Sequence, residues 1–346
     1  MSVDAMYQEL TAKLHDVVPD VELRYKAELA VEVNRLKQEK NAVILGHSYM
    51  EPALYNSIPD YKGDSLELSR KAAQTDKDII IFCGVRFMAE TAKILNPNKT
   101  VLLPAKEAGC SLAASITAED VRQLKARFPG VPVVTYINTY ADVKAESDIC
   151  CTSSNAKAVV ESLPDETVIF LPDEYLASNV AKETGKHIIF PSLSSQANTE
   201  VDFQLIGWHG RCEVHEKFTV QDIKHIRQQF PDVTILTHPE CSPEVVDASA
   251  FSGSTTAMIR YVEQTKAPRY VLLTECAMGE NITAANPDKE ILQLCSVRCP
   301  HMNQIRLEGV RDALLYTRYV IEVPEEIRAR AAKAVERMIA ISAPGA

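Results

Sequence analysis

The sequence predicts an α/β protein made of three similar three-layer α/β/α domains with short parallel sheets. Two observations lead to this fold class. Short strands rich in Val and Ile alternate with amphipathic helical patterns, which is typical of parallel sheets with right-handed crossover connections. The same order of strands, helices and polar residues also occurs three times in succession, which indicates an internal repeat.

Each repeat is predicted to open with a helix that leads into an apolar strand. The three stretches with this pattern are 35–49, 121–140 and 223–240. Two of the helices begin with Thr-x-x-Asp, at Thr117 and Thr219, and this spacing is similar to a capping box with Asp in the place of Glu. The pattern therefore predicts both the start of the helix and the strand that follows it.

Two further apolar strands are predicted in each repeat. The first falls within 78–85, 167–174 and 269–276, and the second within 100–110, 187–192 and 290–296. Helical patterns between the strands include 66–73, 88–95 and 155–163. This alternation divides the chain into predicted domains at 20–114, 115–216 and 217–311.

A C-terminal helix is predicted within 312–346, because the stretch 324–341 is amphipathic. We expect this helix to pack back on the first repeat.

Three classes of residue occupy matching places in the repeats. A polar residue ends the opening strand, at His47, Asn138 and His238. A hydroxyl residue begins a new helix 18, 15 and 16 positions later, at Ser65, Ser153 and Ser254. A cysteine follows the polar residue by 63, 74 and 61 positions, at Cys110, Cys212 and Cys299. The middle interval is the longest because the polar stretch 192–209 lengthens it.

The repeat predicts where these residues meet. Ligands of parallel α/β sheets bind beyond the carboxyl ends of the strands. If the three domains surround a pseudo-threefold axis with those ends inward, the polar residues converge on one cavity. The three cysteines then converge on another point of the same axis.

The composition excludes several classes of protein. The chain has 346 residues, with 37 Lys and Arg against 47 Asp and Glu, and a net charge of −10 that argues against nucleic-acid binding. Hydrophobic residues make up 46% and charged residues 24%, as in soluble globular proteins. No apolar run approaches the roughly 18 residues that a membrane helix needs, and the N-terminus lacks a signal-peptide pattern. We expect a cytoplasmic protein without a membrane or nucleic-acid partner.

The nine cysteines form a poor disulfide framework, because their number is odd and no signal peptide is predicted. The chain contains no close CxxC pair, which disfavours a zinc ribbon. Three thiolates, one from each repeat, suit a 4Fe-4S cluster that leaves one iron without a protein ligand. The alternative is that each cysteine is a small buried apolar residue at a repeated packing position.

The other cysteines fall into two groups. Most sit in or beside apolar strands and are predicted to be core residues: Cys83, Cys150, Cys151 and Cys276. Cys241 follows Glu240 and has no assigned role, and Cys295 is the main rival of Cys299 as the third ligand.

The seven most specific motifs lie between about Asn41 and about Glu308: Gly63–Leu68, Gly84–Pro97, Tyr136–Thr139, Cys151–Asn155, His209–His215, His238–Cys241 and Gly253–Thr256. With these motifs the chain resembles the quinolinate synthase family, whose enzymes act in bacterial and archaeal NAD biosynthesis. Each motif is weakly specific, but all seven in this order make a strong match.

The resemblance implies three α/β/α domains around a pseudo-threefold axis, in agreement with the repeat. It also implies an oxygen-sensitive 4Fe-4S cluster, with ligands at Cys110, Cys212 and Cys299. The implied reaction condenses iminoaspartate with dihydroxyacetone phosphate and releases phosphate and two waters to give quinolinate. The pathway implies an L-aspartate oxidase as the source of iminoaspartate.

Two departures from the family pattern concern the third ligand and the middle repeat. Many relatives carry a CxxCxxC run near the C-terminus, whereas here three residues separate Cys295 from Cys299. We favour Cys299 because Pro300-His301-Met302 follows it, as in the family. The longer 192–209 segment leaves its own loop geometry open.

Hydroxyl groups at the strand-to-helix turns are expected to bind the anionic substrates, since helix N-termini favour phosphate and carboxylate. The candidates are Ser65, Thr152, Ser153, Ser254 and Thr255. Ordinary N-capping is the alternative for each of them.

The resemblance also gives roles to the polar strand ends. His47 and His238 are candidates for binding the iminoaspartate carboxylates, because a protonated imidazole donates from both nitrogens. Tyr136 and Asn138 are expected to hold the phosphate or carbonyl of the triose substrate.

Two residues are the proposed proton carriers. Glu240 is the general-base candidate, because the reaction removes protons from carbon. Tyr49 is a candidate proton donor to a departing hydroxyl, or else an aromatic that excludes water. Arg86 and Lys93 are left out, because they could equally be ion-pair residues of an amphipathic helix.

Three alternative functions remain open on the sequence alone. One is another 4Fe-4S-dependent hydro-lyase that acts on a small polycarboxylate. Another is an iron-sulfur redox sensor, although the chain has no recognisable DNA-binding module or basic patch. The last is a cluster-free α/β protein with coincidental cysteines.

Overall fold

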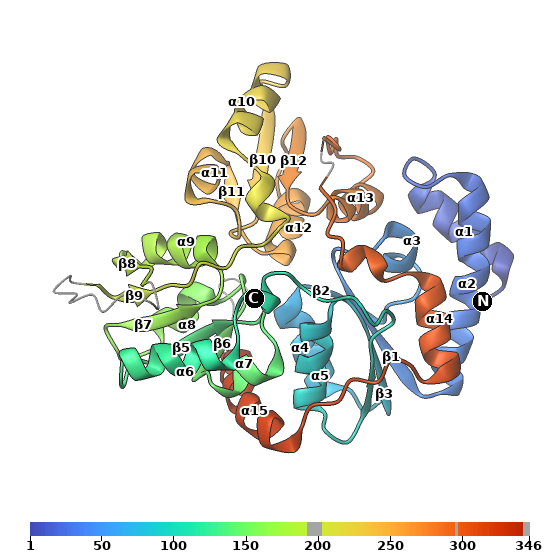
Figure 1. Cartoon of the computed structure of the whole chain (residues 1–346). Coiled ribbons are helices and arrows are strands. Elements are labelled where there is room, and N and C mark those ends of the chain that lie inside the picture. Colours follow the sequence, from blue (N-terminus) through green and yellow to red (C-terminus); the bar gives the residue numbers. More distant parts are fainter. Residues whose placement is uncertain (192–202, 295–296, 342–346) are drawn as a thin grey trace.

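The computed structural model describes residues 1–191, 203–294 and 297–341, and it has an α/β fold with three separate parallel sheets. Figure 1 shows the three sheets around a common centre, each with helices packed beside it. The predicted fold class of short parallel sheets in α/β layers is confirmed. In the described part of the chain, no helix is both long and apolar enough to span a bilayer.

The first sheet has the strand order β2-β1-β3-β4, so its opening strand lies inside the sheet. Its strands are β1 (Ala42–His47), β2 (Tyr61–Gly63), β3 (Ile79–Cys83) and β4 (Thr100–Leu102). Its helices are α1 (Val3–Leu14), α2 (Asp20–Glu39), α3 (Pro52–Tyr55), α4 (Ser65–Gln74) and α5 (Arg86–Leu95). All six residues of β1 are buried, as expected for an inner parallel strand.

The second sheet repeats this order as β6-β5-β7, and then continues with β9-β8. Its strands are β5 (Val133–Tyr136), β6 (Ile149–Cys151), β7 (Val168–Leu171), β8 (Ile188–Ile189) and β9 (Leu205–Ile206). Its helices are η1 (Ala113–Ser115), α6 (Ala118–Arg127), α7 (Ala141–Ala145), α8 (Ala156–Glu161) and α9 (Glu174–Thr184).

The third sheet has the order β11-β10-β12. Its strands are β10 (Val233–Thr237), β11 (Phe251–Ser252) and β12 (Arg269–Leu273). Helices η2 (His215–Lys217), α10 (Val220–Gln229), α11 (Pro243–Ala248), α12 (Thr255–Gln264) and α13 (Cys276–Ala285) belong to this part of the chain, and η3 (Met302–Gln304), α14 (Leu307–Tyr316) and α15 (Glu325–Ala340) follow it.

Both predicted capping boxes are present. The Thr117 hydroxyl accepts from the Asp120 N–H, and Asp120 accepts from the Thr117 N–H in return. Thr219 and Asp222 make the same pair at the start of α10. Asp therefore serves at this position in the role that Glu plays in the usual box.

The strand predictions found the edge strands β4, β8 and β12 but missed the edge strands β2, β6 and β11 and the inner strand β9. The four missed strands have only two or three residues each, too few to give a periodic pattern. The strand predicted in 290–296 was wrong for its described part, where Ile291 makes a single bridge to Tyr270. Residues 295–296, and 192–202 of the long middle segment, lie outside the described residues.

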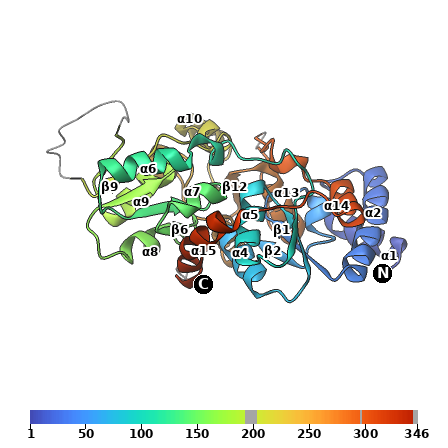
Figure 2. The same cartoon turned by 60° about the horizontal axis from the view of Figure 1, so that its bottom comes forward.

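The C-terminal helix α15 lies between the first and second sheets (Figure 2). It packs against α7 and β6 as well as against α5 and α4, so its contacts are not confined to the first repeat. The Arg70 guanidinium bonds the carbonyls of Ile339 and Ile341, and the Asn155 amide bonds those of Met338 and Ile341. One side chain from the first repeat and one from the second therefore bind the end of this helix, while the exact domain boundaries stay a prediction.

We expect Met338→Ala to lower the free energy of unfolding by about 2–5 kcal/mol, because the substitution leaves a cavity in a packed core. The Met338 side chain is fully buried in α15. Urea unfolding followed by circular dichroism measures the change. Lys333→Ala on the exposed face of the same helix is the control, with an expected change within about 0.5 kcal/mol. Equal losses in the two variants would contradict the bridging role of α15.

Candidate active site

The carboxyl ends of the three inner strands meet at one small cavity of ≈70 Å³. Every residue predicted for the site except Ser254, which lines a neighbouring hollow, lines this cavity: His47, Tyr49, Ser65, Cys110, Tyr136, Asn138, Thr152, Ser153, Cys212, His238, Glu240, Thr255 and Cys299. The predicted convergence of polar residues is therefore present. The three cysteines line the same cavity. The predicted meeting point of the polar residues and the predicted meeting point of the cysteines are therefore next to each other.

His47 and His238 have the same backbone geometry in two different repeats. The Tyr49 N–H donates to His47 Nδ1 at 3.2 Å, and the Glu240 N–H donates to His238 Nδ1 at 3.3 Å. Because Nδ1 accepts in both rings, the neutral imidazole carries its proton on Nε2. Burial lowers the pKa of His47 to about 4 and that of His238 to about 3. Each ring therefore offers one N–H donor near neutral pH, and the expected donation from both nitrogens is opposed by burial.

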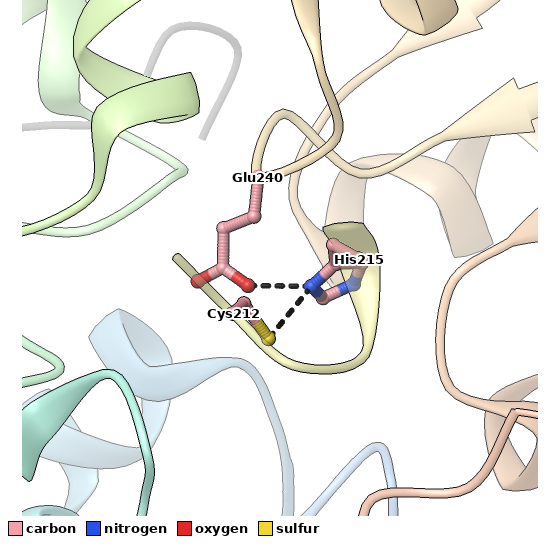
Figure 3. A group of neighbouring side chains, drawn as sticks. All are labelled: Cys212, His215 and Glu240. Carbon is pink, nitrogen blue, oxygen red and sulfur yellow. Dashed lines mark hydrogen bonds and ion pairs between the residues drawn. The ribbon is translucent and has the colours of Figure 1, made fainter. Parts of the chain in front are cut away.

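Glu240 is the most densely bonded side chain of the cavity. Its Oε1 accepts from Asn138 Nδ2 at 3.2 Å, and its Oε2 lies 2.6 Å from His215 Nδ1 (Figure 3). Burial alone would raise the pKa of Glu240, but His215 and a hydrogen bond from Tyr136 outweigh burial and lower this pKa. Glu240 is therefore an ionised carboxylate near neutral pH.

His215 was missed as a site residue. Its Nδ1 also lies 3.2 Å from Cys212 Sγ, and its ring stacks on His238 with centroids 4.5 Å apart. The motif His209–His215 contains the spacing Cys-x-x-His, which was the available signal. The repeat concealed it, because Ala113 and Met302 occupy the equivalent place after the other two cysteines.

Thr274 connects His215 with Tyr49. The Thr274 hydroxyl is 2.9 Å from His215 Nε2 and 2.6 Å from the Tyr49 hydroxyl. Burial raises the pKa of Tyr49 well above its usual value, so this phenol keeps its proton. A continuous set of contacts thus runs from Glu240 through His215 and Thr274 to Tyr49.

Each of the three predicted cysteine ligands is followed by a short 3₁₀ helix that begins three residues later. The N–H groups two and three residues beyond each cysteine bond its sulfur. The Ala113 N–H is 3.5 Å from Cys110 Sγ, and the Met302 N–H is 3.5 Å from Cys299 Sγ. Such N–H groups favour a thiolate, which is the form that binds a metal.

Without a bound metal, burial in the protein opposes the ionisation of the three cysteine thiols. Desolvation raises the pKa of Cys110 to about 12, that of Cys299 to about 11 and that of Cys212 well above its usual value. Three partly exposed thiols with N–H donors on one cavity wall fit a shared metal cluster, whose positive charge would hold them as thiolates. Cys295, the rival ligand, lies outside the described residues.

The remaining described cysteines do not line the cavity. Cys83, Cys150 and Cys151 are completely buried in β3 and β6, as predicted for core residues. Cys276 is buried at the start of α13. Cys241 lies in the apolar core of the third repeat, where its sulfur is 3.7 Å from the Leu273 carbonyl.

The hydroxyl residues at the turns have different local roles. Asp64, not Ser65, caps α4, and it accepts from the N–H groups of Leu66 and Glu67. Ser254 does cap α12, because its hydroxyl accepts from the Ala257 N–H. Thr255 Oγ1 is buried and has no hydrogen-bond partner among the described residues. The capping alternative therefore holds for Ser254 and fails for Ser65 and Thr255.

The cavity is suited to anions although its wall contains carboxylates and, among the described residues that line it, neither Lys nor Arg. Positive potential comes from the N-termini of α4 and α12, each ten residues long. A larger hollow of ≈630 Å³ shares Asp64 and Ser153 with the cavity, and four basic residues line it: Arg70, Lys71, Lys157 and Arg260. Anions approaching through this hollow would meet these charges first.

Arg86 and Lys93 lie outside the cavity. Arg86 pairs with Glu90 at 2.7 Å, and Lys93 bonds the carbonyls of Pro97 and Lys99. Both therefore have the structural role that was the alternative to catalysis.

Comparison with known proteins gives one family. The family model described as quinolinate synthetase A protein matches residues 31–340. A quinolinate synthase 2 of Mesorhizobium japonicum is 54% identical over 306 residues, which cover 88% of this chain and 89% of the relative. Quinolinate synthases of Xylella fastidiosa (53%, covering 88% and 85%) and Caulobacter vibrioides (48%, covering 95% and 86%) are similar too.

We expect Thr274→Val to lower the free energy of unfolding by about 1–3 kcal/mol, because it removes the shorter contact of both His215 Nε2 and the Tyr49 hydroxyl and leaves only their mutual contact at 3.4 Å. Thr274→Ser keeps the hydroxyl and should cost only about 0.8 kcal/mol for the lost methyl group. Denaturant unfolding of both variants provides the comparison. A serine variant less stable than the valine variant would show that the hydroxyl contacts contribute little.

Proposed function

The chain belongs to the quinolinate synthetase A family, and from this premise we propose that its cavity condenses iminoaspartate with dihydroxyacetone phosphate. It is an enzyme with quinolinate synthase activity, and the reaction that it catalyses is a step of NAD biosynthesis. The observation that carries the finer proposal is the meeting of three polar strand ends and three cysteines at one cavity. The reaction balances as iminoaspartate plus dihydroxyacetone phosphate giving quinolinate, phosphate and two waters.

We propose that the anionic groups of the substrates bind to neutral donors. Ser65, Ser153 and Thr255 supply hydroxyls, and the Nε2–H groups of His47 and His238 supply two more donors. The unpartnered Thr255 hydroxyl supports this assignment, because a buried polar atom normally has a hydrogen-bond partner. Tyr136 and Asn138 would then hold the triose substrate beside Glu240.

Glu240 is the proposed general base, because it is ionised and lies within hydrogen-bond reach of His215. The contact of His215 Nδ1 with Oε2 keeps the carboxylate ionised, so that it can take a proton from carbon. Tyr49 remains protonated and can donate to a departing hydroxyl. The contact of both Tyr49 and His215 with Thr274 links the proposed acid to the proposed base.

Cys110, Cys212 and Cys299 are the proposed ligands of a 4Fe-4S cluster. When bound, such a cluster supplies a Lewis acid at the one iron that lacks a protein ligand. The repeated N–H donors to the three sulfurs support this donor set. A single ion held by Cys212, His215 and Glu240 is the competing assignment, since their ligand atoms lie within 4.8 Å of one another.

The cellular setting is proposed on the same premise. We place the enzyme in the cytoplasm, with iminoaspartate supplied by an L-aspartate oxidase, because this imine hydrolyses readily. Family membership favours this activity over a hydro-lyase acting on a polycarboxylate and over an iron-sulfur sensor.

We expect Cys110→Ala, Cys212→Ala and Cys299→Ala each to abolish the cluster, because two remaining thiolates cannot hold it. Iron and sulfide content and the visible spectrum of anaerobically reconstituted protein are the measurements. Cys83→Ala, at a buried core position, is the control and should bind about four irons, as the wild-type protein does. A wild-type protein that binds only about one iron without sulfide, and a Cys110→Ala variant that keeps it, would favour the single-ion site of Cys212, His215 and Glu240.

We expect Glu240→Gln to lower kcat by about 10²–10⁴, the usual contribution of a general base. Its iron content should stay equal to that of the wild-type protein, which separates proton transfer from loss of the cluster. The measurement is anaerobic quinolinate formation from the two substrates. Glu183→Gln, in the larger hollow next to the cavity, is the control and should retain wild-type activity. Unchanged turnover of Glu240→Gln would remove Glu240 as the base.

A further inference from the structure

The turn after β1, which carries His47 and Tyr49, is bonded by a side chain from the third repeat. Asn281 of α13 donates from Nδ2 to the Ser48 carbonyl at 3.2 Å and to the Met50 carbonyl at 2.9 Å. Both partners are acceptors, which fixes the amide nitrogen toward the turn. Asn281 is only 5% exposed, so water does not replace these bonds.

The turn after β10, which carries His238 and Glu240, is bonded in the same way by the second repeat. Asn179 of α9 donates from Nδ2 to the Pro239 carbonyl at 2.8 Å and to the Cys241 carbonyl at 3.0 Å. These are the second and fourth residues of the turn, as Ser48 and Met50 are in the first repeat. The two turns therefore share one mode of attachment.

The turn after β5, which carries Asn138, is also bonded by a neighbouring repeat, but here the turn donates the hydrogen bond instead of accepting it. Glu90 of α5, in the first repeat, accepts from the Ala141 N–H at 2.8 Å. The carbonyls of this turn are instead bonded by Lys144, which lies in the same repeat and donates to Ile137 at 2.9 Å and to Thr139.

The helix contacts follow the same cycle. Helix α13 packs on α3, α9 packs on α11 and α5 packs on α7, and each of these partner helices directly follows one of the three turns (Figure 1). Each repeat therefore holds the polar turn of a neighbouring repeat.

We propose that Asn281 and Asn179 are positioning residues of the condensation reaction, which act across repeats by fixing the two turns that carry His47, Tyr49, His238 and Glu240. This inference rests on the proposed function for its kinetic consequences. Neither residue lines the cavity, although Asn179 lines the larger hollow, so each acts on the reacting groups through the turn that it bonds. Small displacements of reacting groups are costly, because a 1 Å error can lower a rate about a hundredfold.

The pattern differs from ordinary helix capping. Asn286, the C-cap residue of α13, is also buried, but its Nδ2 bonds the Ile282 carbonyl of α13 itself. Asn281 instead leaves its Oδ1 without a partner among the described residues while both of its hydrogen bonds go to the turn. An unpaired buried oxygen is unfavourable, so packing alone does not account for an amide at this position.

The test compares Asn179→Leu, Asn281→Leu and the control Asn286→Leu, which remove an amide of similar volume at three buried sites. We expect Asn179→Leu to lower kcat about tenfold or more, with the KM for each substrate within about threefold, because Glu240 acts in the chemical step. We expect Asn281→Leu to raise the KM for iminoaspartate about tenfold, because His47 binds its carboxylate. Asn286→Leu should keep both constants within about twofold, even where its melting temperature falls equally.

Hydrogen–deuterium exchange supplies a readout that does not depend on activity. Asn179→Leu should speed exchange in residues 238–241 and Asn281→Leu in residues 47–50, each without affecting the other turn, and Asn286→Leu should affect neither. Wild-type activity together with variants that match Asn286→Leu in both readouts would overturn the positioning inference alone. A wild-type protein that forms no quinolinate would overturn the proposed function, whatever the variants show.

Discussion

The burial of polar side chains at the carboxyl ends of three parallel sheets is the constraint on which the rest of this structure depends. A buried polar group is unfavourable unless it is hydrogen-bonded, so each side chain at the centre needs a partner from another strand or another repeat. Glu240 meets this requirement with Asn138 from the second repeat and with His215. Tyr49 of the first repeat meets it with Thr274 of the third. The centre therefore forms only when all three repeats are in place.

The packing of the apolar residues divides the molecule differently from the repeat. Buried residues of the first repeat and of one face of the second sheet belong to one continuous core, which also includes α14 and α15, while the other face of the second sheet has a cluster of its own. The third repeat has its own buried clusters, one on each side of its sheet. The polar centre thus lies where a large shared core meets a smaller separate one. Polar contacts, including those of Asn179 and Asn281, join the two.

Electrostatics at the centre follow from the same burial. Desolvation favours neutral imidazoles at His47 and His238 and a neutral phenol at Tyr49, and it would also favour neutral thiols at the three cysteines. Glu240 is ionised because hydrogen bonds and the adjacent His215 outweigh desolvation. The cavity therefore holds the carboxyl groups of Glu240 and Asp64 beside neutral donors. The four basic residues line the larger hollow and not the cavity, and solvent ions screen the electrostatic effect of their charges on the cavity.

The sequence by itself determined the fold class, the inner strands, the capping boxes and every cavity residue that was named in advance, because strand and helix periodicity, cap spacing and the threefold repeat are all local or regular signals. It did not reveal β9 or the edge strands β2, β6 and β11, which are too short for a pattern, and it predicted a strand at Ile291 where there is one bridge. Only the tertiary structure decided that His215 and Thr274 belong to the site, that α15 contacts two repeats, and that each imidazole carries its proton on Nε2. These features depend on distances between residues up to more than two hundred positions apart, such as Tyr49 and Thr274, and on hydrogen-bond direction, neither of which follows from residue spacing.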